Sequence, residues 1–187
     1  MTAMLTKITY TAVIQDKSEE QGLIAMRMGK NREMEVKIEF TQPDPKTWAF
    51  HNHIAEEYLP KIKTVRQYDL SKHSALINQY LLLGFGSSSK ELEKNYTMTV
   101  GGEESVEAQK TTRVELVPLS DSAKQYLKRV EIWFSATSGN PVQQKFYQNS
   151  GDYYLMTYTD TKMDPNLQES AVRLKLPSGV KREFPQR

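Results

Sequence analysis

Apolar and charged residues alternate with a period of two in the stretch REMEVKIEF, which runs from Arg32 to Phe40. The apolar positions are Met34, Val36, Ile38 and Phe40, and the charged positions between them are Glu33, Glu35, Lys37 and Glu39. Because successive side chains of a strand point to opposite faces of a sheet, this pattern predicts a β-strand with one solvated and one apolar face. What the apolar face contacts therefore decides the function.

Period-two segments of this kind recur along the chain, and turn sequences separate them. The predicted strands are residues 6–15, 21–29, 32–40, 47–54, 62–70, 95–102, 111–118, 127–136, 141–148, 152–160 and 171–177. Strands that follow one another should pair antiparallel, and no internal repeat divides the chain. The pattern predicts a mainly β protein with an antiparallel sheet of about ten or eleven strands.

Helical signal is concentrated between Ser71 and Gly84, and shorter helical turns are expected after Ser88 and after Ser120. The apolar stripe of the main helix is Leu76, Ile77, Tyr80, Leu81 and Leu83. One such helix cannot cover the apolar face of so many strands, so the sheet either folds over on itself or leaves a cavity that a ligand fills. Methionines in the predicted strands suit such a cavity, although strand methionines are more often core residues.

Composition narrows the class of protein. A chain of 187 residues with 38% hydrophobic and 26% charged residues is typical of one soluble domain. The 25 Lys and Arg residues and the 23 Asp and Glu residues are interleaved, which argues against nucleic-acid binding. The absence of cysteine excludes disulfides and thiolate metal sites. The apolar run YLLLGFG is too short to span a membrane, and the opening MTAMLTK does not have the composition of a signal peptide.

Residues that could carry chemistry do not form a catalytic pattern. His51 and His53 are two positions apart on a predicted strand and could bind a metal together with His73, but a partly solvated strand face explains them as well. Adjacent acids such as Glu56 and Glu57 point to opposite faces of a strand and form no acid/base pair. The stretch GFGSSSK lacks the order of a phosphate-binding loop, and no spacing selects a Ser-His-Asp triad. We therefore expect no metal, no other cofactor and no enzymatic activity.

The order of the segments is similar to that of a known family. A long N-terminal meander precedes FTQPDPKTWAF, the helical SALINQYLLLGFGSSSKEL, TTRVELVPLS, VEIWFS and finally SGDYYLMTYTD with AVRLKLPSGVK. The best markers are LLLGFGSSSKEL, the strand end VELVP and the closing LPSGV. In this order the chain resembles the periplasmic lipoprotein carriers of the LolA and LolB type, and most closely their divergent relatives known as outer-membrane lipoprotein-sorting proteins.

The resemblance implies an unclosed, or half, β-barrel whose helices form a lid over an apolar cavity. It makes residues 1–187 one lipoprotein- or lipid-binding domain, and it implies that the cavity takes lipoprotein acyl chains or other lipids. On this hypothesis the residues that line the cavity are Met26, Met28, Met34, Val36, Ile38, Phe40, Trp48, Phe50, Ile77, Leu81, Val114, Leu116, Ile132 and Phe134.

A carrier of this kind would work in the periplasm without spanning a membrane, with an inner-membrane releasing complex and an outer-membrane acceptor as further partners. Two features depart from the family pattern. Gln42 stands before Pro43 where the family has an arginine that holds the lid, and only MTAMLTK precedes the first strand, so we expect the signal peptide and much of the N-terminal helix to be absent. A sensor or regulatory domain with the same fold and a small enzyme that uses the cavity are the alternatives.

Overall fold

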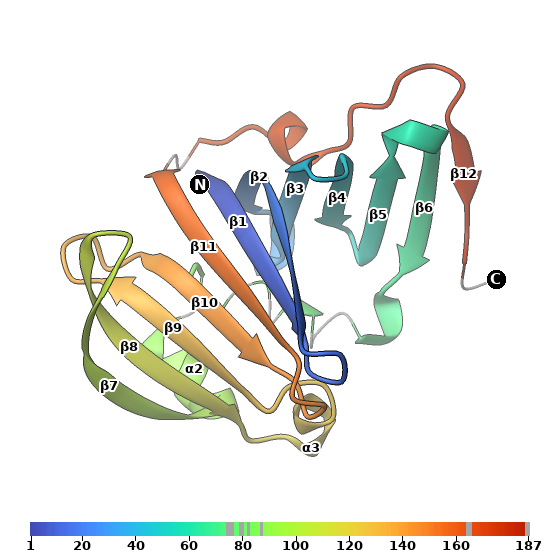
Figure 1. Cartoon of the computed structure of the whole chain (residues 1–187). Coiled ribbons are helices and arrows are strands. Elements are labelled where there is room, and N and C mark those ends of the chain that lie inside the picture. The colour runs from blue at the N-terminus through green and yellow to red at the C-terminus, as the bar shows by residue number, and fades with distance from the viewer. Residues whose placement is uncertain (74–76, 79–80, 82, 87, 164–165, 186–187) are drawn as a thin grey trace. The chain divides into compact units, whose positions relative to one another are not determined.

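The computed structural model describes residues 1–73, 77–78, 81, 83–86, 88–163 and 166–185 (Figure 1). Its strands are β1 (Thr2–Thr11), β2 (Asp16–Met28), β3 (Met34–Gln42), β4 (Lys46–His51), β5 (Ile54–Leu59), β6 (Thr64–Asp69), β7 (Tyr96–Val106), β8 (Gln109–Pro118), β9 (Arg129–Ser135), β10 (Pro141–Tyr147), β11 (Tyr153–Lys162) and β12 (Lys181–Glu183). The helical elements are α2 (Ser89–Asn95), α3 (Asp121–Lys124), and the 3-10 turns η1 (Lys30–Arg32), η2 (Pro60–Ile62), η3 (Ser71–His73) and η4 (Glu169–Val172).

The twelve strands form one sheet in the order β12-β6-β5-β4-β3-β2-β1-β11-β10-β9-β8-β7. Strand β12 pairs with β6 in parallel, whereas sequential strands such as β3 and β4 pair antiparallel. The sheet is unclosed, because β12 and β7 end it without pairing to each other in the described chain. The predicted fold class, mainly β with an unclosed antiparallel sheet and few helices, is confirmed. No helix of the described residues has the length and hydrophobicity to cross a membrane.

The chain forms two compact units. Unit 1 comprises Met1–Met4, Glu20–Leu82 and Asp160–Arg187, and unit 2 comprises Leu5–Glu19 and Leu83–Thr159. The core of unit 1 includes the fully buried Val36, Ala49 and Val65. The core of unit 2 includes the fully buried Leu116, Val130 and Ile132.

The two short helices begin where the sequence places capping residues. Ser88 precedes α2 and its hydroxyl accepts a hydrogen bond from the backbone N–H of Glu91 at 3.3 Å, while the Glu91 carboxylate accepts one from the backbone N–H of Ser88 at 2.8 Å. This reciprocal capping box satisfies backbone donors that the first helical turn leaves free. Ser120 caps α3 through the N–H of Ala123. Both predicted turns are confirmed.

The predicted main helix is described only in part. Leu76 and Tyr80 lie outside the described residues, whereas Ile77, Asn78 and Leu81 are helical. Leu83 lies in a turn after the helix and is buried.

Three predicted strands differ from the structure. The segment 47–54 is not one strand, because Asn52 and His53 adopt positive φ angles in a turn between β4 and β5. The segment 171–177 is not a strand either: η4 ends at Val172, and the final strand is β12. Strand β1 ends at Thr11, so Ile14 is not a strand residue but lies with Val13 in an exposed turn.

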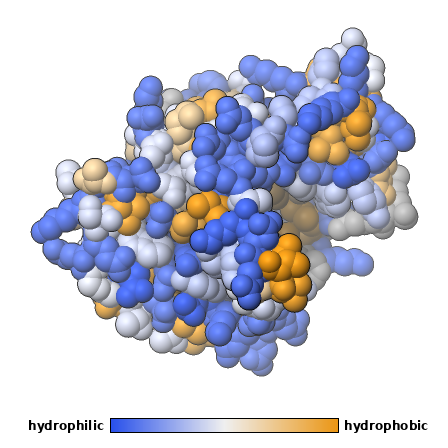
Figure 2. All heavy atoms as spheres, in the orientation of Figure 1, coloured by the Kyte–Doolittle hydropathy of each residue, from blue (hydrophilic) through white to orange (hydrophobic). Residues whose placement is uncertain are grey.

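On the face seen in Figure 2, hydrophobic residues appear as separate groups on a largely hydrophilic surface, which is usual for a folded domain.

Candidate ligand-binding surface

An apolar, aromatic surface covers one face of strands β3 to β6 in unit 1. It consists of Ile38, Trp48, Phe50 and Tyr68, and we call it the aromatic face. Alternation along each strand and the register between strands bring these side chains together: Ile38 pairs with Trp48, and Val36 with Phe50. The Trp48 ring stacks on both Phe50 and Tyr68, with ring centroids 6.0 Å apart in each pair. All four side chains are half-buried, so each still has surface that a ligand could cover.

Charged side chains border the aromatic face. Glu57 is the cross-strand partner of Trp48, and Arg66 is the partner of Glu57. The Arg66 guanidinium lies 3.6 Å from the Glu57 carboxylate and 3.4 Å from that of Glu183 in β12. A hydrogen bond from Lys181, followed by one from Arg66, lowers the pKa of Glu183 and keeps that carboxylate charged. A surface with an aromatic centre and a charged edge can bind amphipathic molecules.

A small pocket lies where the described part of the main helix meets the ends of β3 and β4. Its lining includes Met34, Phe50, His51, Ile77 and Leu81, and its volume is about 30 Å³. Such a space holds about one water molecule and cannot hold an acyl chain. This pocket is therefore not the ligand cavity that the sequence resemblance implied.

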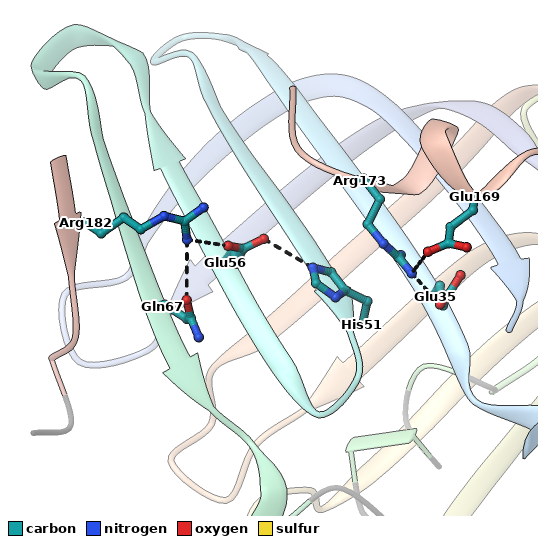
Figure 3. A network of polar contacts seen from close by, with 7 residues as sticks. All are labelled: Glu35, His51, Glu56, Gln67, Glu169, Arg173 and Arg182. Carbon is teal, nitrogen blue, oxygen red and sulfur yellow. Dashed lines mark hydrogen bonds and ion pairs between the residues drawn. The ribbon is translucent and has the colours of Figure 1, made fainter. Parts of the chain in front are cut away.

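The opposite face of β3 carries a buried ion-pair network rather than a solvated surface. Glu35 is only 7% exposed. Its carboxylate accepts hydrogen bonds from Arg27 in β2 at 3.1 Å and from Arg173, just after η4, at 2.7 Å. Figure 3 shows Arg173 reaching both Glu35 and Glu169. Arg173 belongs to residues 169–177, which we call the C-terminal segment. The prediction that Glu35 is solvated is wrong, because the C-terminal segment packs on this face and supplies the partner for its charge.

A second network on the same face ties β12 to the sheet (Figure 3). His51 Nε2 lies 3.1 Å from one oxygen of Glu56, and Arg182 of β12 donates to the other oxygen at 2.9 Å. Arg182 also lies 3.4 Å from the side-chain oxygen of Gln67. The hydrogen bond from His51, followed by that from Arg182, lowers the pKa of Glu56 even though burial opposes this.

His51 and His53 each pair with a different glutamate rather than with each other. His51 pairs with Glu56, whereas His53 lies in the turn and pairs with Glu33 at 3.2 Å. In the described part of the chain, no group of three His, Asp or Glu residues is arranged to hold a metal ion.

The corresponding apolar face in unit 2 is covered by the chain's own residues. Leu116, Val130 and Ile132 are fully buried on one side of β8 and β9. The Gln144 side chain, also buried, donates a hydrogen bond to the Leu83 carbonyl at 2.7 Å and accepts one from the Tyr158 hydroxyl at 2.6 Å. Burial raises the pKa of Tyr158, so its hydroxyl stays protonated and remains a donor.

The segment that receives the Gln144 hydrogen bond also packs closely against the rest of unit 2. A Cβ atom added at Gly84, where φ is +80°, would lie 2.8 Å from the Pro141 side chain and 3.6 Å from the Ile132 side chain. The Gly84 backbone therefore lies close to both side chains. The Phe85 ring then packs edge-on against Tyr158, with centroids 5.1 Å apart. The segment Leu83–Phe85 is thus docked on the apolar face of unit 2.

The fourteen residues predicted to line a cavity fall into both units and differ in exposure. The buried ones are Met26, Met34, Val36, Phe40, Leu116 and Ile132. The half-buried ones are Ile38, Trp48, Phe50, Ile77, Leu81, Val114 and Phe134, and Met28 is exposed. Of these, Met34, Phe50, Ile77 and Leu81 share the small pocket.

Sequence reasoning missed Tyr68 and Gln144. Tyr68 lies in a predicted strand two residues from Arg66, so alternation could have found its face once the register of β6 was known. Nothing in the local sequence of PVQQKFYQ distinguishes Gln144 from Gln143, and only the docked Leu83 carbonyl gives the former its role.

No protein-family model and no curated protein sequence matches the chain. Solved structures do show a similar fold. An uncharacterized conserved protein from Thermus thermophilus is 11% identical, with a TM-score of 0.55, over 98% of this chain and 90% of its own. MucB is 11% identical with a TM-score of 0.52, and the match covers 94% of this chain and 58% of that of MucB.

A LolA superfamily protein from Nitrosomonas europaea is 13% identical with a TM-score of 0.41, over 92% of this chain and 89% of its own. At these identities the likeness is one of fold.

Proposed function

We propose that this protein binds lipoprotein acyl chains or other lipids and carries them in the periplasm, with the aromatic face as the binding surface. The observation that carries the proposal is the half-buried state of Ile38, Trp48, Phe50 and Tyr68, which form one continuous surface on β3 to β6. Each acyl methylene buried there contributes on the order of 0.8 kcal/mol, so binding requires apolar area more than polar contacts.

The charged edge suits the polar end of an amphipathic ligand. Arg66 lies beside the aromatic face, next to Glu57 and Glu183, and its side chain is 39% exposed. A ligand with an acyl chain over Trp48 would place its polar part near this guanidinium, which can donate to a phosphate or carbonyl oxygen.

The order of the segments along the sequence supports a place in lipoprotein transport, because it resembles that of the carriers of the LolA and LolB type. On this proposal residues 1–187 act as a lipid-binding domain that receives its cargo from an inner-membrane releasing complex and delivers it to an outer-membrane acceptor.

Tryptophan fluorescence tests the proposal directly. The chain has 2 tryptophans, so Trp133→Phe leaves Trp48 as the single reporter. Addition of a fatty acid should shift Trp48 emission to shorter wavelength, and a fatty acid brominated along its chain should quench it. Ile38→Asn should abolish both effects, because the amide places a polar group next to Trp48.

A matched control lies on the other face of the neighbouring strand. Leu23 is exposed on β2, where alternation places it away from the aromatic face, so Leu23→Asn should leave fatty-acid binding unchanged. The proposal fails if the wild type shows no response to fatty acid, or if Leu23→Asn weakens it as much as Ile38→Asn does.

A protein segment is the second candidate ligand. MucB, whose fold is similar, has been solved in complex with MucA in Pseudomonas aeruginosa. An apolar peptide segment could cover the same aromatic face while its charged residues meet Arg66 and Glu57. A partner protein captured by the lipid-free protein, and released when fatty acid is added, would favour this regulatory function.

A further inference from the structure

A larger pocket lies in unit 1 under the C-terminal segment, and it is distinct from the aromatic face. Its volume is about 390 Å³, within the range of small-molecule sites. The lining residues are Lys37, Glu39, Phe40, Thr41, Pro45, Lys46, Thr47, Tyr58, Pro60, Leu174 and Lys175. Glu39 pairs with Thr47 and Thr47 with Tyr58, so these three side chains form a row across β3, β4 and β5. Leu174 and Lys175 of the C-terminal segment form a further wall of the pocket.

The pocket has more positive than negative groups. It contains the three lysines Lys37, Lys46 and Lys175 and the single acid Glu39. Lys46 is already paired with Glu20. The Lys37 ammonium is 3.7 Å from Glu39, too far for a hydrogen bond, although its side chain is only 20% exposed.

The remaining donors of the pocket are available to a ligand. Within the described chain, neither the Lys175 ammonium nor the Tyr58 hydroxyl has a hydrogen-bond or ion-pair partner. A half-buried ammonium such as that of Lys37, with one distant carboxylate, is stabilised by a second negative group that accepts its hydrogen bonds. The charge of the pocket therefore favours an anion.

Apolar walls complement these charges. Phe40 is buried, and Tyr58, Pro60 and Leu174 are half-buried in the lining. We infer that this pocket binds a small amphipathic anion, whose carboxylate or phosphate group contacts Lys37 and Lys175 and whose apolar part packs against Tyr58 and Leu174. This site does not depend on the proposed function, because Lys37 and Ile38 point to opposite faces of β3.

Calorimetric titration with octyl phosphate tests the inference. Lys37→Met should weaken octyl phosphate binding about tenfold or more, because it removes a charge-assisted hydrogen bond. Lys175→Met should also weaken it. Glu39→Gln should strengthen binding, because it removes the carboxylate that competes for Lys37. Lys162→Met, an exposed lysine outside the pocket, should have no effect.

Neutral and lipid-borne ligands complete the test. Octanol should bind much more weakly than octyl phosphate. Lysine-dependent binding of octyl phosphate in solution identifies a free amphiphile, and lysine-dependent binding only to vesicles of phosphatidylglycerol identifies a lipid headgroup. The inference is overturned if neither binds, if octanol binds as tightly as octyl phosphate, or if Lys37→Met and Glu39→Gln both leave affinity unchanged.

The proposals for the aromatic face and for the pocket can be disproved independently of each other. Lys37→Met should leave the Trp48 response to fatty acid intact, and Ile38→Asn should leave octyl phosphate binding intact. If Lys37→Met does not fold, Lys175→Met and Glu39→Gln, which change exposed side chains, decide the matter.

Discussion

The two units treat their apolar faces differently. In unit 2 the chain itself covers the face: the segment Leu83–Phe85 packs over Ile132, and Gln144 holds it through the Leu83 carbonyl. In unit 1 the residues of the aromatic face stay half-buried, and the C-terminal segment packs on the polar face instead, where Arg173 meets Glu35. The same alternation of residues thus gives a closed core in one unit and a surface with unfilled apolar area in the other.

This difference teaches that a period-two pattern identifies the two faces of a strand but not which face the chain will cover. In β3 the more polar face is the one that the C-terminal segment covers, because arginines of β2 and of that segment neutralise Glu35. A binding surface is therefore expected where apolar side chains keep exposed area, as Trp48 does, and not wherever an apolar stripe occurs.

Identical substitutions in the two units give the largest expected contrast. Ile132→Asn places an amide in a fully buried position, and the unsatisfied group plus the lost packing should cost about 4 kcal/mol or more. Ile38→Asn leaves the amide in contact with water and should cost about 1 kcal/mol. Urea unfolding of both variants measures the difference, and equal costs would show that the aromatic face is also a packed core.

A charge reversal at Glu35 should be nearly as damaging. Glu35→Lys would bury a third cation beside Arg27 and Arg173, and removal of one partner from a buried ion pair costs about 3 to 5 kcal/mol. Glu39→Lys is the matched control on the same strand, because its side chain is 49% exposed, and it should change stability by less than about 0.5 kcal/mol. Equal, small effects in urea unfolding would mean that the polar face is open to solvent after all.

Removal of the Gln144 contact should have a smaller effect. Gln144→Leu fills a similar volume but removes the partner of the Leu83 carbonyl and leaves the Tyr158 hydroxyl only its weaker contact with the Met156 sulfur at 3.5 Å, at a cost of about 1 to 3 kcal/mol. Amide hydrogen exchange in the segment Leu83–Gly86 should accelerate relative to β9. The neighbouring Gln143→Leu, which loses only a contact to Thr157, serves as control. Unchanged exchange after Gln144→Leu would mean that packing alone holds the segment.

Much of the fold could be predicted from local pattern. The strands from β6 to β11 and the capped helices α2 and α3 lie where alternation and the Ser88 and Ser120 caps indicated. These signals are local, because a strand's faces and a helix's first turn depend on residues within a few positions. No separate strand was predicted over β5, because the adjacent acids Glu56 and Glu57 interrupt the apolar alternation there, whereas Glu56 is paired with Arg182, 126 residues away.

The parts that could not be predicted depend on contacts between distant segments. The C-terminal stretch AVRLKLP alternates like a strand, but it runs over β3 so that Arg173 can reach Glu35, 138 residues away. The pocket of about 390 Å³ arises from the same crossing, since Leu174 and Lys175 form its wall. Aromatic residues of the candidate surface, such as Trp48 and Phe50, were in contrast visible in the sequence, because one strand carries both.

The smallest expected effect is a loss of stability at acid pH, which should arise on the polar face of unit 1 and leave its aromatic face unchanged. The pKa of Glu56 is lowered in the folded protein from its ordinary value of 4.5, first by the His51 hydrogen bond and then by Arg182. The unfolded chain therefore binds a proton more readily, so the stability that Glu56 contributes is present above that value and is lost as pH falls through the lower folded pKa. Glu56→Gln should flatten the pH dependence of urea unfolding in this acid range, and Arg182→Met should remove only part of it.

Exchange measurements locate the same effect within unit 1. As pH falls, the amides of Lys181–Glu183, once corrected for the pH dependence of intrinsic exchange, should lose protection before those of β3, because protonated Glu56 no longer holds Arg182. Fatty-acid binding at Trp48 should persist over the pH range in which β12 loosens but β3 stays protected, since Glu56 and Trp48 occupy opposite faces of the sheet. If Trp48 lost its ligand at the same pH at which β12 loosens, the two faces would be coupled, and an ordered β12 would be required for binding at the aromatic face.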